Sequence, residues 1–172
     1  MKTVERHRYS GKKIFQTRTL TFEPYAMTEI ESVMALIRDN LSSELLKGRK
    51  SLLYPGDIWV NKLYGHCYHS TQALHFLMDD VDSVLFPMSA DDYRGEKHWW
   101  LSDGDFIYDV TSEQYYFAGQ TPPHVSGKKT SYYGWKQRPQ QISLNLMVKV
   151  LGDRLVGDTV QDLTDDENSS TI

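Results

Sequence analysis

The strongest local pattern of hydrophobic and polar positions lies in residues 97–111. Two runs rich in aromatic and β-branched residues flank the pair Asp103-Gly104. This pattern is typical of a β-hairpin whose two-residue turn is Asp-Gly. In that register Trp100 lies opposite Ile107. Large side chains then occupy both faces, and we expect the hairpin to be covered on both sides.

The same register predicts that His98 lies opposite Asp109. Residues directly opposite on an antiparallel pair share a face, with Cβ atoms roughly 4.5–5.5 Å apart. The turn alone therefore places an imidazole and a carboxylate within hydrogen-bond reach. A buried ion pair or a hydrogen-bonded core histidine is the simplest interpretation of such a pair.

Helical patterns occur on either side of this hairpin. Residues 27–47 carry a one-sided apolar stripe, Thr28 with Glu31 reads as a capping box, and Asn40 with the following serines is a potential break before Gly48. Residues 140–151 fit a strand or a helix face, and the flanking proline and glycine favour a helix. Residues 83–88 predict a strand that ends at the proline, followed over residues 89–97 by a mobile charged loop.

The only cysteine, Cys67, lies at the start of another predicted helix. Gly65 precedes it, and residues at helical spacing form one apolar face that includes the sulfur: Cys67, Ser70, Thr71, Leu74, Leu77 and Met78. A helix N-terminus favours an anion and lowers a thiol pKa from about 8.5. Together with His98 and Asp109, this cysteine would complete a nucleophile, base and orienting group. An inert cysteine in the core is the alternative.

The order of these motifs resembles a known family. Gly65-His66-Cys67 opens a helix, His98-Trp99-Trp100 lies on a strand, and Tyr108-Asp109-Val110-Thr111 lies on the next. Residues 60–116 thus resemble the core of the transglutaminase-like branch of papain-like cysteine enzymes, and the nearest relatives we expect are small bacterial or phage proteins. The resemblance implies an α+β fold with the cysteine helix packed on an antiparallel sheet. It assigns Cys67 as nucleophile, His98 as general base and Asp109 as orienter, although Val110 stands where the family often has proline.

Four further residues are candidates for the substrate side of the site. In the papain group a side-chain amide upstream of the cysteine joins its backbone N–H in the oxyanion hole. Asn61, six residues before Cys67, resembles that placement, although an asparagine in a surface turn is the alternative. Trp59, Trp100 and Trp135 are candidates to line a substrate groove, and each could instead belong to the core.

The expected function is that of a thiol-dependent hydrolase or acyltransferase acting on an amide bond through a thioester, with protease or deamidase activity favoured and no cofactor. The substrate would be a protein or peptide. The alternative is a catalytically inactive copy of the fold that binds protein or nucleic acid. Nucleic acid would bind to a segment in which aromatic residues that stack on bases alternate with basic residues that neutralise phosphates. Its residues are Lys128, Lys129, Tyr132, Tyr133, Trp135, Lys136 and Arg138.

A zinc site is a rival interpretation of the histidines. Its ligands would come from His66, Cys67, His69, His75 and His98. Neighbouring residues on a helix point about 100° apart, however, and the chain has no Cys-x-x-Cys pair. We therefore expect no metal.

Composition bounds the remaining possibilities. The 172 residues, 40% hydrophobic and 24% charged, predict one domain over residues 1–160 and a disordered acidic tail over residues 161–172. The net charge of −4 gives no general attraction to nucleic acid or membrane. One cysteine and no apolar leader or membrane span predict a cytoplasmic protein, in the host cytoplasm for a phage product. The basic residues 1–22 predict an edge strand guarded by lysines, or alternatively an arm that contacts phosphates or an acidic partner.

Overall fold

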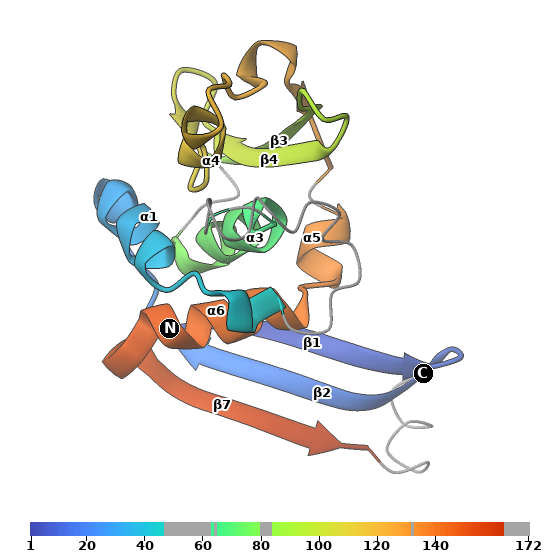
Figure 1. Ribbon diagram of the computed structural model, residues 1–172. Helices are drawn as coiled ribbons and strands as arrows, with labels where there is room; N and C mark the ends of the chain where they lie inside the picture. The colour runs from blue at the N-terminus through green and yellow to red at the C-terminus, as the bar shows by residue number, and fades with distance from the viewer. Residues whose placement is uncertain (47–62, 64, 80–83, 132, 164–172) are drawn as a thin grey trace.

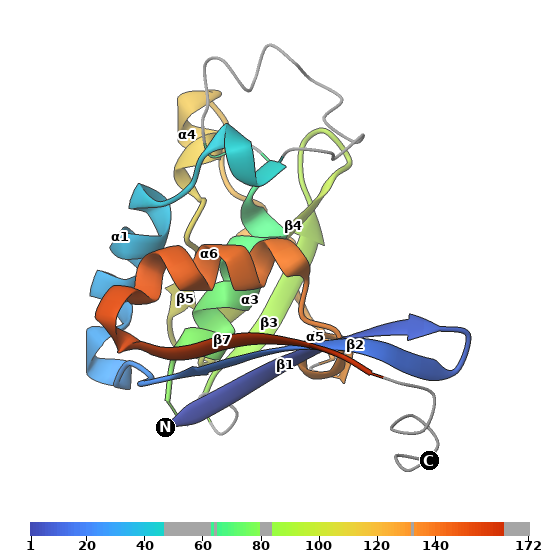
Figure 2. The same ribbon diagram turned by 90° about the horizontal axis from the view of Figure 1, so that it is seen from below.

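The computed structural model describes residues 1–46, 63, 65–79, 84–131 and 133–163. They form a mixed α+β fold in which helices lie between two antiparallel sheets (Figures 1 and 2). One sheet has the strand order β1-β2-β7 and the other has the order β5-β4-β3-β6. The expected α+β class is therefore confirmed, and the described chain has no helix long and apolar enough to cross a bilayer.

The first sheet joins the two ends of the described chain. Strands β1 (Lys2–Ser10) and β2 (Lys13–Phe22) form a long hairpin, and β7 (Leu155–Asp162) adds to β2. Gln161 pairs with Thr17 in this sheet, so the acidic tail does not begin at residue 161. Residues 164–172 lie outside the described part of the chain.

The central helices are α3 (Cys67–Leu77) and α6 (Gln141–Leu151), with α1 (Ile30–Asp39) packed beside them. The helices predicted around Cys67 and after Pro139 are thus confirmed. Two further helices are shorter. Helix α4 (Glu113–Phe117) lies near the second sheet, and α5 (Tyr133–Gln137) lies near α6. Leu20, Leu74 and Leu144, from β2, α3 and α6, are fully buried and connect the layers.

The helix predicted over residues 27–47 is broken where the sequence indicated. α1 ends at Asp39, and a 3₁₀ turn occupies Ser43–Leu46. The capping box is wrong, because the α-helix begins at Ile30 and it is Glu29 that accepts a hydrogen bond from the Ala26 N–H, at 3.1 Å. Gly48 lies outside the described residues.

The second sheet contains β3 (Phe86–Asp91), β4 (Lys97–Ser102), β5 (Ile107–Tyr108) and β6 (Lys128–Lys129). Strand β3 does not end at the proline as predicted but runs through it to Asp91. The expected mobile loop is therefore partly strand, and its remainder is a tight turn. In that turn Asp92 accepts hydrogen bonds from the N–H groups of Arg94 and Glu96 at 2.8 and 3.0 Å.

The hairpin of β4 and β5 differs from the prediction by one turn position. The central turn residues are Gly104 and Asp105, with Gly104 at φ 98°, a backbone conformation that favours glycine. Leu101 consequently pairs with Tyr108, and the register is shifted by two residues. Phe106 is 66% exposed, so the hairpin is not covered on both sides.

Helix α3 is buried on nearly every side, including its polar residues. Gln72 shows how this is achieved. Its Oε1 accepts hydrogen bonds from the Gln140 N–H at 2.9 Å and from the Ser143 hydroxyl at 2.6 Å, and its Nε2 donates to the Trp135 carbonyl at 3.3 Å. One buried amide thus joins α3 to α5 and to the start of α6.

Candidate active site

Cys67 is the first residue of α3, and its side chain is partly exposed. Within the described residues, the first turn of the helix contains no acidic residue and no side-chain cap, so it leaves the positive end of the helix dipole next to the sulfur. The sulfur lies 3.7 Å from the carbonyl oxygen of Lys97. The Thr71 hydroxyl, one turn later, lies 2.6 Å from the Cys67 carbonyl and 3.1 Å from that of Trp99. These contacts fix the start of α3 against β4, on either side of His98.

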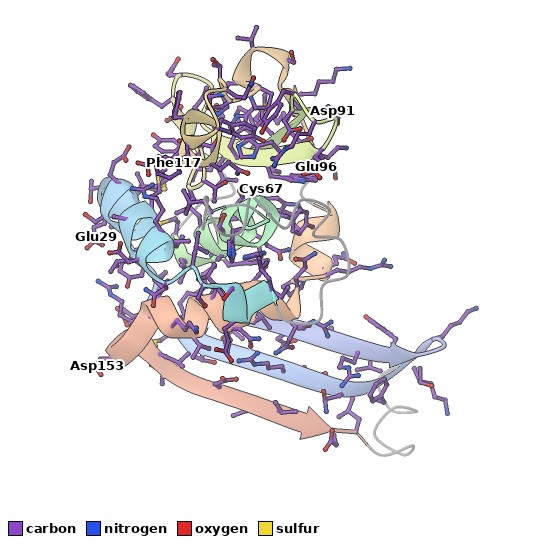
Figure 3. The ribbon with its side chains drawn as sticks, viewed as in Figure 1. Glu29, Cys67, Asp91, Glu96, Phe117 and Asp153 are labelled. Carbon is purple, nitrogen blue, oxygen red and sulfur yellow. The ribbon has the colours of Figure 1, made fainter. Side chains whose placement is uncertain are left out.

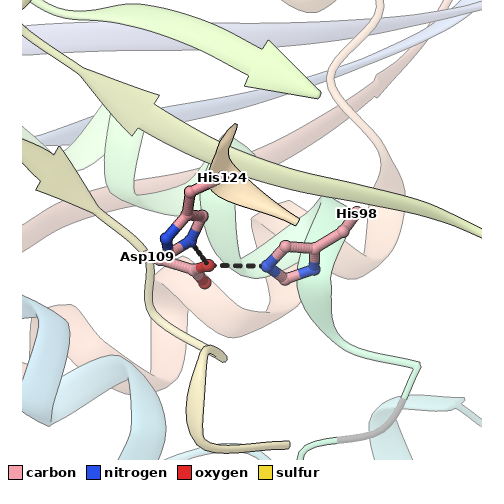
Figure 4. Close-up of side chains that lie close together, drawn as sticks. All are labelled: His98, Asp109 and His124. Carbon is pink, nitrogen blue, oxygen red and sulfur yellow. Dashed lines mark hydrogen bonds and ion pairs between the residues drawn. The ribbon is translucent and has the colours of Figure 1, made fainter. Parts of the chain in front are cut away.

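His98 lies on β4 with its side chain fully buried. Its Nε2 lies 2.6 Å from Oδ2 of Asp109 (Figure 4), which confirms the predicted histidine–carboxylate pair. The imidazole packs edge-to-face against Tyr115, at 4.8 Å between ring centroids, and lies 5.8 Å from the ring of Trp100. Aromatic packing on the ring leaves it little freedom to rotate away from Asp109.

Asp109 follows β5 and accepts hydrogen bonds from two histidines. Its Oδ2 lies 2.7 Å from Nε2 of His124, a second contact that Figure 4 shows beside His98. Its Oδ1 accepts a hydrogen bond from the Thr111 N–H at 3.1 Å. Burial alone raises the pKa of Asp109, but the hydrogen bonds and charges of His124 and His98 outweigh it and hold that pKa below its usual value.

The ionised Asp109 determines which nitrogen of His98 carries a proton. A carboxylate can only accept, so the hydrogen bond to Asp109 requires a proton on Nε2. Neutral His98 then has its lone pair on Nδ1, which makes no hydrogen bond within the described part of the chain. That nitrogen is therefore available to accept a proton from a thiol.

The pKa of His98 reflects both of its partners. Burial lowers this pKa, but the hydrogen bond that His98 donates to Asp109 and the interaction with the Cys67 sulfur raise it by more, to about 9. The sulfur can accept a hydrogen bond from a protonated Nδ1, although in the present geometry the thiol donates to the Lys97 carbonyl. The arrangement thus favours a cationic imidazole beside the sulfur.

This raised pKa predicts that stability decreases in alkaline solution. The folded His98 has a pKa of about 9, against about 6.5 in an unfolded chain. The contribution of the protonated His98 to the free energy of unfolding is complete below pH 6.5 and is lost as the pH rises through 9. We expect the free energy of unfolding to fall by roughly 3 kcal/mol over this range, as urea denaturation at pH 6, 7.5 and 9.5 would measure. His98→Gln should flatten the profile and His7→Ala should not; a flat profile for the unsubstituted protein would contradict the charged pair.

The turn before β4 supports the ring that packs on His98. Asp92 has a nearly fully buried side chain, which accepts a hydrogen bond from the Tyr115 hydroxyl at 2.9 Å and forms an ion pair with Arg94 at 2.9 Å. These contacts lower the pKa of Asp92 despite its burial. The charged turn therefore holds Tyr115 in place against the imidazole.

The backbone of Gly127 lies directly against the Trp100 ring beside the site. A Cβ atom there would overlap Cζ2 of Trp100 and lie 2.9 Å from its Cη2. We expect Gly127→Ala to cost about 1–3 kcal/mol, because the buried Trp100 ring, 4.9 Å from that of His124, has no space to move. Thermal unfolding measures this cost. Gly134→Ala is the matched control, since its Cβ meets nothing within 4 Å, and an equal loss in both variants would contradict the packing argument.

A metal ion is a further possibility at this cluster. The ligand atoms of His98, Asp109 and His124 lie within 4.8 Å of one another. In the present geometry two N–H donors share one carboxylate oxygen. Zinc would need both Nε2 atoms deprotonated and about 2.0–2.1 Å from the ion, and it would replace both hydrogen bonds.

The residues considered as zinc ligands in the sequence analysis do not come together in this way. His66 and His69 are hydrogen-bonded to each other at 2.7 Å, and His75 packs edge-to-face on Trp135. Within the described ranges, the group that could hold a metal includes only His98 from that set. The rival interpretation, a zinc site built from this set of ligands, is therefore wrong.

The structure brings together the three residues predicted to be catalytic, but the two predicted substrate residues that it describes are buried. Trp59 and Asn61 lie outside the described residues. Trp100 and Trp135 are 1% and 2% exposed, so they pack behind the site and present no surface to a substrate. The burial of Trp135 also removes it from the proposed base-stacking segment. His124, to which the sequence analysis gave no role, is the residue that the prediction missed.

Comparison of the chain with protein-family models, with curated proteins and with solved structures gives no match.

Proposed function

We propose that this protein is a thiol-dependent hydrolase or acyltransferase in which Cys67, His98 and Asp109 form a catalytic triad. The observation that carries the proposal is the buried 2.6 Å hydrogen bond between His98 and Asp109 beside a partly exposed cysteine at a helix start. The order and placement of the three residues resemble a transglutaminase-like, papain-like core, which supports the same proposal by analogy alone.

In the proposed mechanism Nδ1 of His98 takes the proton of the Cys67 thiol. The sulfur then attacks the carbonyl carbon of an amide, and the backbone N–H of Cys67 stabilises the oxyanion, with Asn61 proposed as a second donor. The imidazolium returns the proton to the leaving amine as the C–N bond breaks, which leaves a thioester on Cys67. Water resolves the thioester in a protease or deamidase, and an amine resolves it in an acyltransferase.

His124 has a positioning role in this mechanism. With Thr111, it holds the carboxylate of Asp109 in a fixed orientation through a 2.7 Å hydrogen bond. A carboxylate fixed in this way keeps the His98 ring aligned for proton transfer. We expect His124 to affect the alignment of His98 and not the covalent step itself.

The experiment that tests the proposal measures acyl-enzyme formation with p-nitrophenyl acetate. We expect one equivalent of p-nitrophenolate to be released rapidly per chain, and mass spectrometry to find the acetyl group on Cys67. Cys67→Ala should abolish the burst, and His98→Ala should slow it by at least about 10²-fold. The matched control His7→Ala, on β1 away from the site, should retain it.

An acetyl group found on lysines alone, or equal rates for His98→Ala and His7→Ala, would overturn the triad. Added hydroxylamine distinguishes the two outcomes of the thioester, because an amine acceptor accelerates turnover only where the site admits it. The same assay at increasing concentrations of an alkyl amine therefore separates a hydrolase from an acyltransferase.

A second candidate function is metal-dependent hydrolysis at His98, Asp109 and His124, and it is favoured by the convergence of their ligand atoms. Zinc titration of the protein distinguishes it from the thiol mechanism. The triad predicts that zinc inhibits the acetyl burst and that a chelator restores it. Activation by zinc that survives Cys67→Ala would instead support the metal mechanism.

A further inference from the structure

A pocket distinct from the proposed active site lies on the β1-β2-β7 sheet. On the face where Val4 and Leu20 are buried, the sheet continues beyond α6 toward the hairpin end (Figures 1 and 2). The next pair along this face is Arg6 opposite Arg18, and the pair after it includes Arg8. The face that packs on the core therefore carries three guanidinium groups where the core ends.

In the part of the chain that the structure describes, only Arg18 among these three arginines has a carboxylate partner. Arg18 donates to both carboxylate oxygens of Asp158 at 2.9 Å and to Asn145 at 2.8 Å. Arg8 donates to the neutral amide oxygen of Gln16 at 3.2 Å. The guanidinium group of Arg6 has no hydrogen bond or ion pair with the described residues, although the side chain is partly buried. Asp162, opposite Gln16 on the same face, accepts a hydrogen bond from the Gln16 amide at 2.8 Å. Among the described residues, three guanidinium groups thus face two carboxylates.

The placement of Arg6 is unfavourable for folding alone. Like charges directly opposite on an antiparallel pair destabilise the sheet. Burial and the charges of Arg8 and Arg18 together lower the pKa of the Arg6 guanidinium. A residue kept for packing would not need this charge, whereas a bound anion would neutralise it.

The arginines line a pocket of about 560 Å³ together with Gln16 and Gln141. Gln141 is the first residue of α6, and the N–H groups at the start of an 11-residue helix favour an anion. Guanidinium groups recognise phosphate oxygens through paired hydrogen bonds. The volume lies in the range of small-molecule sites, roughly 300–1,000 Å³.

We propose that this pocket binds a small phosphorylated molecule, with Arg6 as the residue that captures the phosphate group. Arg18 is already held by Asp158 and forms the rigid wall, while Arg8 at the outer edge supplies further donors. The Gln16 amide is occupied by Asp162 and Arg8. A small ligand is favoured over a nucleic acid because the site is a pocket of limited extent on a chain of net charge −4. This site is separate in sequence and sheet from the proposed triad.

Isothermal titration of the full chain with pyrophosphate and with ADP tests the proposal. We expect saturable binding of at least one of these probes, weakened about tenfold or more by Arg6→Gln and less by Arg6→Lys, which keeps the charge without the forked donor geometry. Lys12→Gln, at the hairpin tip outside the pocket, makes the same change in charge and should leave affinity unchanged. Cys67→Ala should also bind normally, which separates this site from the proposed chemistry.

A thermal unfolding measurement provides a second readout. Without phosphate, Arg6→Gln should unfold at the same temperature as the unsubstituted protein or higher, because it removes the repulsion with Arg18, and pyrophosphate should stabilise only the unsubstituted protein. Equal weakening by Arg6→Gln and Lys12→Gln, or no binding of either probe at millimolar concentration, would overturn the proposal. Tighter binding of a single-stranded oligonucleotide than of ADP would also overturn it, in favour of a nucleic-acid surface.

Discussion

Asp109→Asn is expected to reduce the rate of Cys67 acylation by about 10³-fold or more. The carboxylate accepts hydrogen bonds from His98, His124 and Thr111, and an amide in its place must turn a donor toward at least one of them. With the NH₂ toward the imidazole, His98 loses the contact that fixes its proton on Nε2; with the NH₂ toward Thr111, it keeps only a weaker, neutral acceptor. In serine-protease triads the equivalent change costs about 10⁴-fold through the wrong tautomer.

The p-nitrophenyl acetate burst measures this effect, and circular dichroism confirms that the variant folds. Asp105→Asn is the matched control, since Asp105 occupies the exposed turn of the same hairpin. The control should acylate at the unsubstituted rate. An Asp109→Asn variant that folds and acylates within tenfold of the control would show that Asp109 does not orient the base.

The second large effect is expected in the polar interior of α3. Gln72→Leu should lower the free energy of unfolding by about 3 kcal/mol or more, because it leaves the Gln140 N–H, the Ser143 hydroxyl and the Trp135 carbonyl without their buried partner. For a chain of this size the midpoint of thermal unfolding should fall by roughly 6–12 °C.

Scanning calorimetry measures this change. Gln120→Leu, at an exposed position after α4, is the control and should shift the midpoint by little. Equal midpoints for the two variants would mean that the Gln72 amide does not join α3 to α5 and α6. It would also remove the explanation for a central helix with so many buried polar residues.

The pairing of His98 with Asp109 was predictable even though the hairpin register was not. The Asp-Gly signal misplaced the turn by one residue, since Gly104 occupies the first central position and not the second. Moving a two-residue turn by one position shifts the register by two. Side chains alternate with a period of two, so His98 and Asp109 stay on one face, and Asp109 reaches the imidazole along a diagonal.

The remaining parts of the site depend on contacts that no local pattern records. His124 reaches Asp109 from a short turn after α4, and Tyr115 is held against His98 by Asp92, 23 residues earlier. Neither pairing has a characteristic spacing. The apolar face of α3 was predicted from its period, but the burial of its opposite face was not, because hydrogen bonds to residues as distant as Ser143 make it possible.

Strand β7 was missed for a related reason. Its burial alternates only at its beginning and most of its residues are exposed, so its sequence lacks the apolar alternation that indicates a strand. Pairing with β2 along its length holds it in the sheet, which includes Gln161 and Asp162 of the segment expected to be a tail. Backbone hydrogen bonds to a partner strand leave no signature in hydropathy.

The most direct test of the central claim is the rate of iodoacetamide alkylation of Cys67 as a function of pH, in the unsubstituted protein and in His98→Ala. A thiol whose proton is taken by His98 should alkylate rapidly at neutral pH, and His98→Ala should slow that reaction by about tenfold or more while leaving the rate in strongly alkaline solution unchanged. A thiol that alkylates with the same profile in both proteins, or that does not react while folded, would contradict the catalytic pair.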